Sequence, residues 1–157
     1  MESLDRMEII KASDLLKKSF EEFLPYFEDN KETLLKKDKI SPLLLKCFKY
    51  INSPTLIKLI DFGFQYDFTI PDTKMSFLQT LIVNEEIEKA TVLVVKYKFK
   101  NIDFVHKDSK QTALMMASYM NSAKLGQALL FKGADPTLRD INGLTALQIV
   151  RLNNKKK

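Results

Sequence analysis

Two residue types that commonly carry enzyme or metal chemistry occur once each in this chain of 157 residues, as His106 and Cys47. Any Ser-His-Asp or Cys-His arrangement would have to use His106, because imidazole is the usual general base. A structural zinc site needs about four Cys or His ligands, which is more than the chain has. Cys47 lies in the apolar stretch 43–48, so we interpret it as a buried thiol. We therefore expect neither a catalytic centre nor a bound metal.

Other motifs of enzyme chemistry are weak. The four glycines are too widely spaced for a phosphate-binding loop or a dinucleotide fingerprint. Glu85, Glu86 and Glu88 are the best candidates for paired carboxylates. We place them near a junction between two helices, where acidic residues usually face water or favour a helix N-terminus. The sequence thus predicts no enzyme activity and no cofactor.

A basic and aromatic segment raises the question of nucleic acid. Residues 96–100 read Lys-Tyr-Lys-Phe-Lys, and alternating bases and rings can hold a single strand. The simpler interpretation, which we adopt, packs Tyr97 and Phe99 into the core and leaves the lysines in water. The net charge is +5, and residues 108–157 hold the excess, with eight Lys or Arg against three Asp or Glu. Such an end can attract nucleic acid, anionic lipid or an acidic protein surface, or it can be a solvated tail. We do not expect nucleic acid to be the partner.

A sequence repeat indicates which elements would position a binding surface. Residues 112–117 read Thr-Ala-Leu-Met-Met-Ala, and 33 positions later residues 145–150 read Thr-Ala-Leu-Gln-Ile-Val. Between them come Ala-Leu-Leu-Phe-Lys-Gly-Ala-Asp-Pro at 128–136 and Asp-Ile-Asn-Gly-Leu at 140–144. This pattern resembles the ankyrin repeat, which reads roughly Asp-x-x-Gly-x-Thr-Pro-Leu-His-x-Ala, continues to a Leu-Leu pair and ends in Gly-Ala-Asp. The chain departs from it by having alanine in the place of the proline.

The resemblance extends upstream with decreasing strength. Residues 41–43 read Ser-Pro-Leu and residues 59–63 read Leu-Ile-Asp-Phe-Gly, like the start and the end of one unit. Residues 76–78 read Ser-Phe-Leu and would start the next unit, whose second helix would close at 93–95. Units therefore start near 41, 76, 112 and 145. The similarity is strongest over 108–149, intermediate over 41–67 and weakest over 76–107.

The resemblance implies an all-α fold, an ankyrin-repeat solenoid of helix-turn-helix pairs with a helical N-terminal cap. Residues 1–40 would form the cap and residues 41–157 the repeats, together one domain. In the cap, Pro25 is expected to end or kink the first helix, and residues 33–37 to form a second, short helix. The last unit has only its first helix. Either that helix closes the stack, or the chain is part of a longer protein.

Several residues of the repeat have a local physical role. Thr112 and Thr145 are suited to cap a helix N-terminus through the side-chain oxygen. Gly133 follows the second helix, where a left-handed residue is needed, so we expect it to have a positive φ. Ala117 and Ala123 are small where helices are expected to approach closely. Leu129 and Leu130 are expected to be buried between adjacent units, with Leu114 and Leu147 packing nearby.

The resemblance also implies a function, namely protein–protein interaction without catalysis. Members of the family usually bind a partner protein through the concave face and the loop tips before each repeat start. The corresponding residues here are Asp72, Thr73, Met75, Asp108, Ser109, Gln111, Tyr119, Met120, Ile141, Asn142 and Leu144. We expect Tyr119, Met120, Ile141 and Leu144 to form one contiguous apolar patch, unless Ile141 and Leu144 turn inward. The alternative function is a structural subunit whose incomplete last repeat is covered by a neighbour in a larger assembly.

The cellular location is expected to be the cytoplasm, with the nucleus as an alternative. No apolar run approaches the ~18 residues that a membrane-spanning helix needs. The N-terminus carries acidic residues where a secretory signal would have bases, and no apolar stretch follows. A single cysteine also suits a reducing compartment. The sequence does not identify the partner protein.

Overall fold

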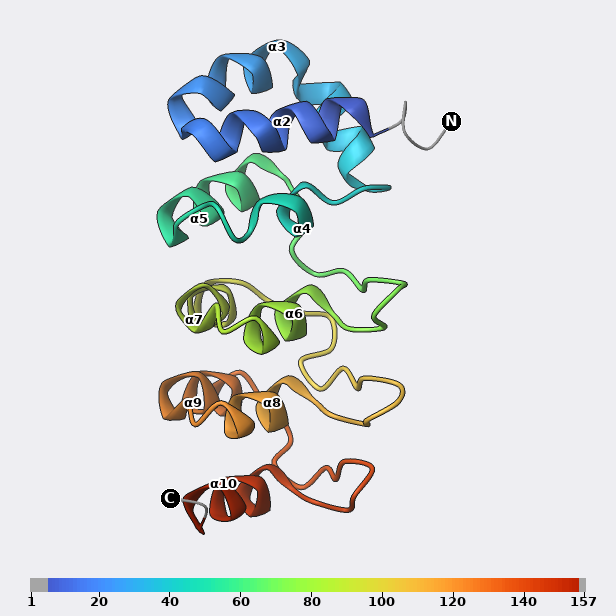
Figure 1. The fold of residues 1–157 in the computed structure, drawn as a ribbon, viewed down its shortest axis with the longest axis vertical. Helices are drawn as coiled ribbons and strands as arrows, with labels where there is room; N and C mark the ends of the chain where they lie inside the picture. The colour runs from blue at the N-terminus through green and yellow to red at the C-terminus, as the bar shows by residue number, and fades with distance from the viewer. Residues whose placement is uncertain (1–5, 156–157) are drawn as a thin grey trace. The chain divides into compact units, whose positions relative to one another are not determined.

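The computed structural model describes residues 6–155, and this part of the chain is all-helical, which confirms the predicted all-α class. The chain divides into two compact units, Met1–Tyr66 and Asp67–Lys157. Each unit is described by itself below (Figure 1). Within the described residues, no helix is both long enough and apolar enough to cross a membrane.

The first unit contains α2 (Met7–Lys18), α3 (Phe20–Asp38), α4 (Leu43–Cys47) and α5 (Ser53–Phe62). Helix α2 packs against both α3 and α4. Its buried residues Ile9, Ala12 and Leu16 recur at helical spacing, so they form one apolar face. Cys47 is fully buried, as its apolar surroundings in the sequence predict.

The first helical break lies at Ser19, which corrects the prediction for Pro25. Ser19 has extended backbone angles (φ −170°, ψ 158°), and its hydroxyl accepts the N–H of Glu22 at 3.1 Å to begin α3. Pro25 lies inside α3, which continues past it and bends instead at Asn30, where φ is −125° and ψ is 19°. The predicted short helix 33–37 is the last part of α3. The hydroxyl cap of Ser19 thus marks the boundary between α2 and α3.

Aromatic rings hold α3 and α5 together. Phe27 and Phe62 stack with ring centroids 4.6 Å apart and planes 8° from parallel. Phe23 and Phe64 pack against Phe27 from other directions. These rings fill the space between the two helices, and aromatic pairs add about 0.5–1.5 kcal/mol each beyond the area they bury.

A buried carboxylate joins the end of α3 to the helices that follow. Asp38 accepts the N–H of Leu43 at 2.7 Å and the N–H of Gln65 at 2.8 Å. Burial raises the pKa of Asp38 above its usual 3.8, and the hydrogen bonds from Leu43 and Gln65 lower it by less. The carboxyl therefore satisfies two backbone donors that would otherwise be buried unpaired.

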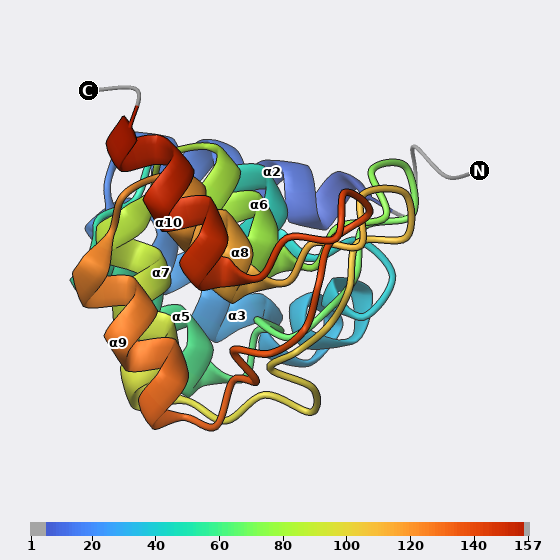
Figure 2. The same ribbon diagram turned by 90° about the horizontal axis from the view of Figure 1, so that it is seen from below.

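The second unit contains α6 (Phe77–Val83), α7 (Ile87–Lys96), α8 (Ala113–Tyr119), α9 (Ala123–Phe131) and α10 (Ala146–Lys155). Helices α6 and α7 form one pair, and α8 and α9 form the next. Helix α8 lies between α6 and α10, and α7 packs on α9. The long loops that precede α6, α8 and α10 project to one side of this unit, as both views show (Figure 1, Figure 2).

The core of the second unit corrects two predicted positions. Leu114 and Leu129 are buried as expected, with 4% and 0% of their surface exposed. Leu130 is 47% exposed, so the prediction that it is buried is wrong. Leu147, which was expected to pack nearby, lines the same groove as Leu114 and Leu130 and is 57% exposed. Leu125 and Leu129 are four residues apart and occupy the inward face of α9, which turns Leu130 by about 100° away from it. Ala123 is likewise exposed and does not mark a close helix contact.

The segment after α7 agrees with the core interpretation. Tyr97 and Phe99 are half-buried. The three lysines that alternate with them are exposed, namely Lys96, Lys98 and Lys100.

Candidate functional site

The candidate site consists of three loops in the second unit: the first loop (residues 69–76), the second loop (103–111) and the third loop (136–144). Each loop runs into a helix whose first turn is capped by a hydroxyl. Ser76 accepts the N–H of Gln79 at 3.1 Å, Thr112 that of Met115 at 3.3 Å, and Thr145 that of Gln148 at 3.3 Å. The predicted capping roles of Thr112 and Thr145 are confirmed. The caps fix the direction in which each loop enters the helix that follows it.

A left-handed residue turns each loop two positions before its cap. These residues are Lys74 with φ 62°, Lys110 with φ 57° and Gly143 with φ 78°. Backbone hydrogen bonds close the first turn from Ile70 to Met75 and the second from His106 to Gln111. The third turn closes in the same way but is one residue shorter. Gly133, after α9, also has the predicted positive φ, at 95°.

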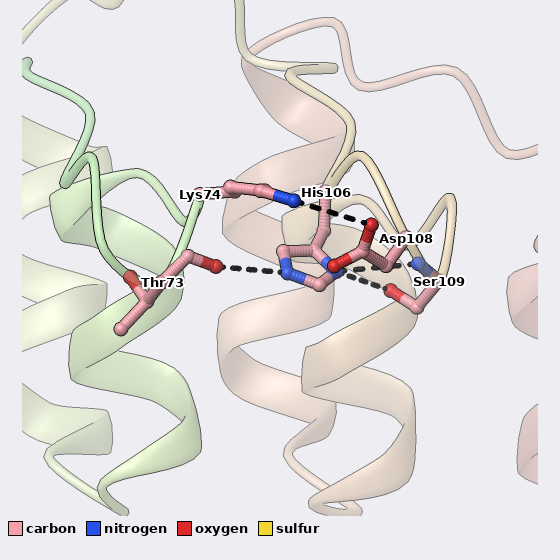
Figure 3. Close-up of polar contacts among 5 residues, drawn as sticks. All are labelled: Thr73, Lys74, His106, Asp108 and Ser109. Atoms are coloured by element: carbon pink, nitrogen blue, oxygen red, sulfur yellow. Dashed lines mark hydrogen bonds and ion pairs between the residues drawn. The ribbon is translucent and has the colours of Figure 1, made fainter.

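His106 connects the first loop to the second (Figure 3). Its Nε2 lies 3.0 Å from the carbonyl oxygen of Thr73, and its Nδ1 lies 2.9 Å from the hydroxyl oxygen of Ser109. The N–H of Ser109 also donates to Nδ1, at 3.3 Å. A carbonyl can only accept and an N–H can only donate, so these contacts fit the tautomer that has its proton on Nε2. The geometry gives His106 a positioning role within the loops.

The side chains at the loop tips add little to this connection. Lys74 Nζ and Asp108 Oδ1 lie 3.7 Å apart, and their side chains are 48% and 66% exposed (Figure 3). Exposed ion pairs contribute about 0–1 kcal/mol because water and salt screen them. Of the two side-chain contacts between the first and second loops, the hydrogen bond between His106 Nε2 and the Thr73 carbonyl has the shorter distance and the better-defined geometry.

Further hydrogen bonds join segments about one repeat apart. The Ser109 carbonyl accepts the N–H of Ile141, at 2.9 Å, which links the second loop to the third. Near the loop bases, the Asp103 carboxylate accepts the N–H of Asp135 at 2.9 Å. Asp67 accepts the N–H of Lys100 at 2.8 Å in the same manner. Hydrogen bonds thus connect the first loop to the second and the second loop to the third.

Gln79 is a structural residue of this site that the sequence analysis missed. Its side-chain oxygen accepts the N–H of Ser76 at 3.1 Å, which completes a capping box. Its amide nitrogen donates to the carbonyls of Phe104 at 3.0 Å and Gln111 at 3.1 Å, so it holds the second loop against α6. The spacing of Ser76 and Gln79 is the capping-box spacing, which is the local signal that points to this glutamine.

The predicted binding residues of the loops differ in how much they protrude. Those that are exposed at the tips are Asp72, Thr73, Asp108, Ile141 and Asn142. Those that are half-buried are Met75, Ser109, Gln111 and Leu144. Ile141 is 61% exposed and does not turn inward, whereas Leu144 is partly covered. The exposed group is the part of the prediction that is available to a partner.

The expected contiguous apolar patch does not form. Tyr119 is 41% exposed and Met120 is half-buried, but they are the last residue and the C-cap of α8, at the opposite end of that helix from the second loop. Asn153, near the end of α10, donates to the carbonyl of Tyr119 at 3.1 Å. Eight residues of helix separate Asn153 from Thr145 at the base of the third loop, a distance of roughly 12 Å at about 1.5 Å per residue. Tyr119 and Ile141 therefore belong to two separate areas.

Glu85, Glu86 and Glu88 lie where α6 ends and α7 begins, near the predicted helix junction. Glu85 is exposed and has a positive φ of 62°, which suits a tight connection between helices. Glu86 forms an ion pair with Lys89 at 2.7 Å. Across residues 6–155, no group of three or more His, Cys, Asp or Glu side chains is arranged to hold a metal ion.

Comparison of the chain with protein-family models and with curated proteins found no match.

Proposed function

We propose that this chain is a non-catalytic, ankyrin-type repeat protein that binds a partner protein through its loop tips and the concave face beside them. The observation that carries the proposal is the bonding between the three loops of the second unit. His106 joins the second loop to Thr73, and the Ser109 carbonyl joins it to Ile141. Loops held in one conformation before binding lose less conformational entropy when a partner docks.

Support for the repeat assignment comes from the local geometry of the second unit. A left-handed turn residue, a hydroxyl cap and a helix follow one another at Ser76, Thr112 and Thr145. These three positions are the starts inferred from the ankyrin resemblance. An ankyrin-type solenoid accounts for the recurrence, and such a solenoid presents an extended concave surface for binding.

The exposed groups at the tips suit recognition of a protein surface. Asp72 and Asp108 offer carboxylates, Asn142 offers an amide and Ile141 offers an aliphatic side chain. Protein interfaces combine an apolar centre with a polar rim of this kind. Tyr119, at the far end of α8, adds an exposed aromatic side chain of a type enriched in binding hot spots.

Affinity purification from the native cell extract tests the proposal. The bait is the full chain, compared with a loop variant that combines Asp72→Ala, Asp108→Ala and Ile141→Ala. Glu32→Ala, at an exposed position of α3, is the matched surface control. We expect one protein to be retained by the parent chain and the control but lost with the loop variant. Retention by all three baits, with circular dichroism showing equal folding, would reject the loop tips as the binding surface.

A structural-subunit role is the second candidate, and the apolar surface of the last helix favours it. Leu147 and Leu152 are 57% and 44% exposed on α10. A permanent neighbour would remove this surface from water, which is favourable by about 25 cal/mol per Å². Sedimentation of the purified chain separates the roles, because a subunit lacking its neighbour should self-associate or aggregate.

A further inference from the structure

An apolar groove of about 500 Å³ lies among α8, α9 and α10, on the side of the second unit away from the first loop. Its lining is mostly aliphatic and includes Leu114, Ala117, Gly126, Leu130, Leu147 and Val150. Pro136, at the start of the third loop, is the one residue of the three loops in the lining, and none of the loop-tip residues discussed above lines it. The groove is therefore a surface separate from the loop tips.

The groove exists because the packing pattern of the second unit stops at α9. Helix α9 packs on α7 and α8 packs on α10. Among residues 6–155, no helix packs on α9 in the way that α9 packs on α7. The lining residues Leu130 and Leu147 are consequently 47% and 57% exposed. A contiguous apolar surface of this kind often marks a binding site, so the groove has the character of a binding surface.

The shape of the groove fits one short helix. Helices α9 and α10 have 9 and 10 residues, so each wall is roughly 14–15 Å long at about 1.5 Å per residue. Gly126 and Ala117 keep the floor low, which allows the backbone of a bound helix to approach closely. Leu130 and Leu147 then stand on opposite walls, where they can contact apolar side chains spaced three and four residues apart.

The charge of the two walls indicates which side chains should border the apolar face of a bound helix. Helices α9 and α10 carry Lys124, Arg151 and Lys155, all exposed, and neither helix contains an acidic residue. Lys124 adjoins the lining residue Ala123, and Arg151 lies one turn after Leu147. One acid, Asp135, adjoins the lining residue Pro136, and its hydrogen bonds with Thr137 lower its pKa, which favours the charged form. The two helical walls themselves carry positive charge only.

We propose that this groove binds an amphipathic helix of two to three turns from another protein, with an aliphatic face and acidic flanks. The aliphatic face enters between Leu130 and Leu147, and the flanking carboxylates pair with Lys124 and Arg151. Charge complementarity selects this occupant over a basic or neutral helix and increases its association rate. Binding here does not require the loop tips, so it stands or falls separately from the function proposed above.

The test uses two labelled helical peptides of about eleven residues, which is about three turns and roughly 17 Å as a helix. Both carry leucine at positions i, i+3, i+4 and i+7, and one has glutamate and the other lysine at the flanking positions. Fluorescence anisotropy with the full chain at physiological salt should show saturable binding of the glutamate peptide. The lysine peptide should bind at least about tenfold more weakly, a difference of about 1.4 kcal/mol. Equal binding of the two peptides would overturn the proposal.

Two variants locate the binding. Gly126→Leu should abolish binding by filling the groove, and it should fold well because a Cβ at Gly126 makes only an ordinary 3.9 Å contact with Leu114. Arg151→Glu should reverse the preference between the peptides. Val95→Ser, at an exposed apolar position of α7, and Ile141→Ala, in the third loop, should leave peptide binding unchanged.

Three results would assign the groove to something else. Unchanged binding to Gly126→Leu would place the peptide elsewhere on the molecule. A concentration-dependent dimer that Gly126→Leu abolishes would make a second copy of the chain the occupant. Displacement of the glutamate peptide by single-stranded DNA would assign the basic walls to nucleic acid, and that competition should weaken steeply with salt.

Discussion

His106 Nε2 lies 3.0 Å from the carbonyl oxygen of Thr73, a residue 33 positions earlier in the chain. The other ring nitrogen accepts the N–H of Ser109 within its own loop. One imidazole thus holds the turn of the second loop and connects it to the first. The residue that seemed most suited to catalysis in the sequence is used to position two loops.

Replacing His106 with phenylalanine should loosen the loops without unfolding the unit. Phenylalanine keeps a flat aromatic ring, slightly larger than imidazole, but the hydrogen bonds to Thr73 and Ser109 are lost, at about 1 kcal/mol for each bond. Amide hydrogen exchange at Ser109 should become faster, while exchange in α8 stays slow. Lys74→Ala is the control, because it removes only an exposed ion pair. Unchanged exchange at Ser109 would show that the imidazole does not hold the turn.

The two adjacent leucines of α9 should differ sharply in their effect on stability. Leu129 is fully buried, so Leu129→Ala should lower the free energy of unfolding by about 2–5 kcal/mol. Leu130 is 47% exposed, so Leu130→Ala should cost about 1 kcal/mol or less. Chemical denaturation of both variants measures the difference. Equal costs would mean that the inward face of α9 is wrongly assigned.

Two glycines should respond in opposite ways to alanine. Gly133 has a φ of 95° with no atom within 4 Å of a built Cβ, so Gly133→Ala should destabilise by about 1 kcal/mol through backbone strain alone. Gly126 lies inside α9, so Gly126→Ala should stabilise by about 0.5–1 kcal/mol through helix propensity. Thermal melts of the pair check this, and a shift of Tm in the same direction for both contradicts it.

The pKa of Asp38 gives stability a defined dependence on pH. Because burial raises the folded pKa, the folded state binds more protons than the unfolded state between the unfolded value near 3.8 and the raised value. The contribution of this group to stability is therefore fully present below pH 3.8 and is lost as pH rises through the folded pKa. Asp38→Asn removes the titration. The parent chain should gain stability relative to this variant as pH falls through that window. A relative loss on acidification would mean that the hydrogen bonds outweigh burial.

Local signals in the sequence predicted much of the second unit. Thr112 and Thr145 cap their helices, and Gly133 takes a left-handed conformation, because each depends on a few neighbouring residues. Ser19 was missed in the first unit, because a proline seemed the stronger break. Leu130 was placed wrongly because a Leu-Leu pair does not itself reveal which member faces the core; adjacent helical residues point about 100° apart.

The contacts within the candidate site are harder to predict from the sequence than the caps and turns. The exposure of Asp72 and Asp108 follows from their place in polar loops. The bond from His106 to Thr73 has no local signal, because it depends on the stacking of segments 33 residues apart. The separation of Tyr119 from Ile141 has no local signal either. It depends on the length of α10, which runs from the third loop to the end of α8.

The closure of each loop by backbone hydrogen bonds makes the tips suitable for engineering. Asp72, Asp108 and Asn142 are exposed, and the ion pair of Asp108 with Lys74 is exposed as well. A library that randomises these three positions would vary the chemistry of the tips while leaving the turns, the caps and His106 in place. The second unit therefore offers a framework from which variants that bind new target proteins can be selected.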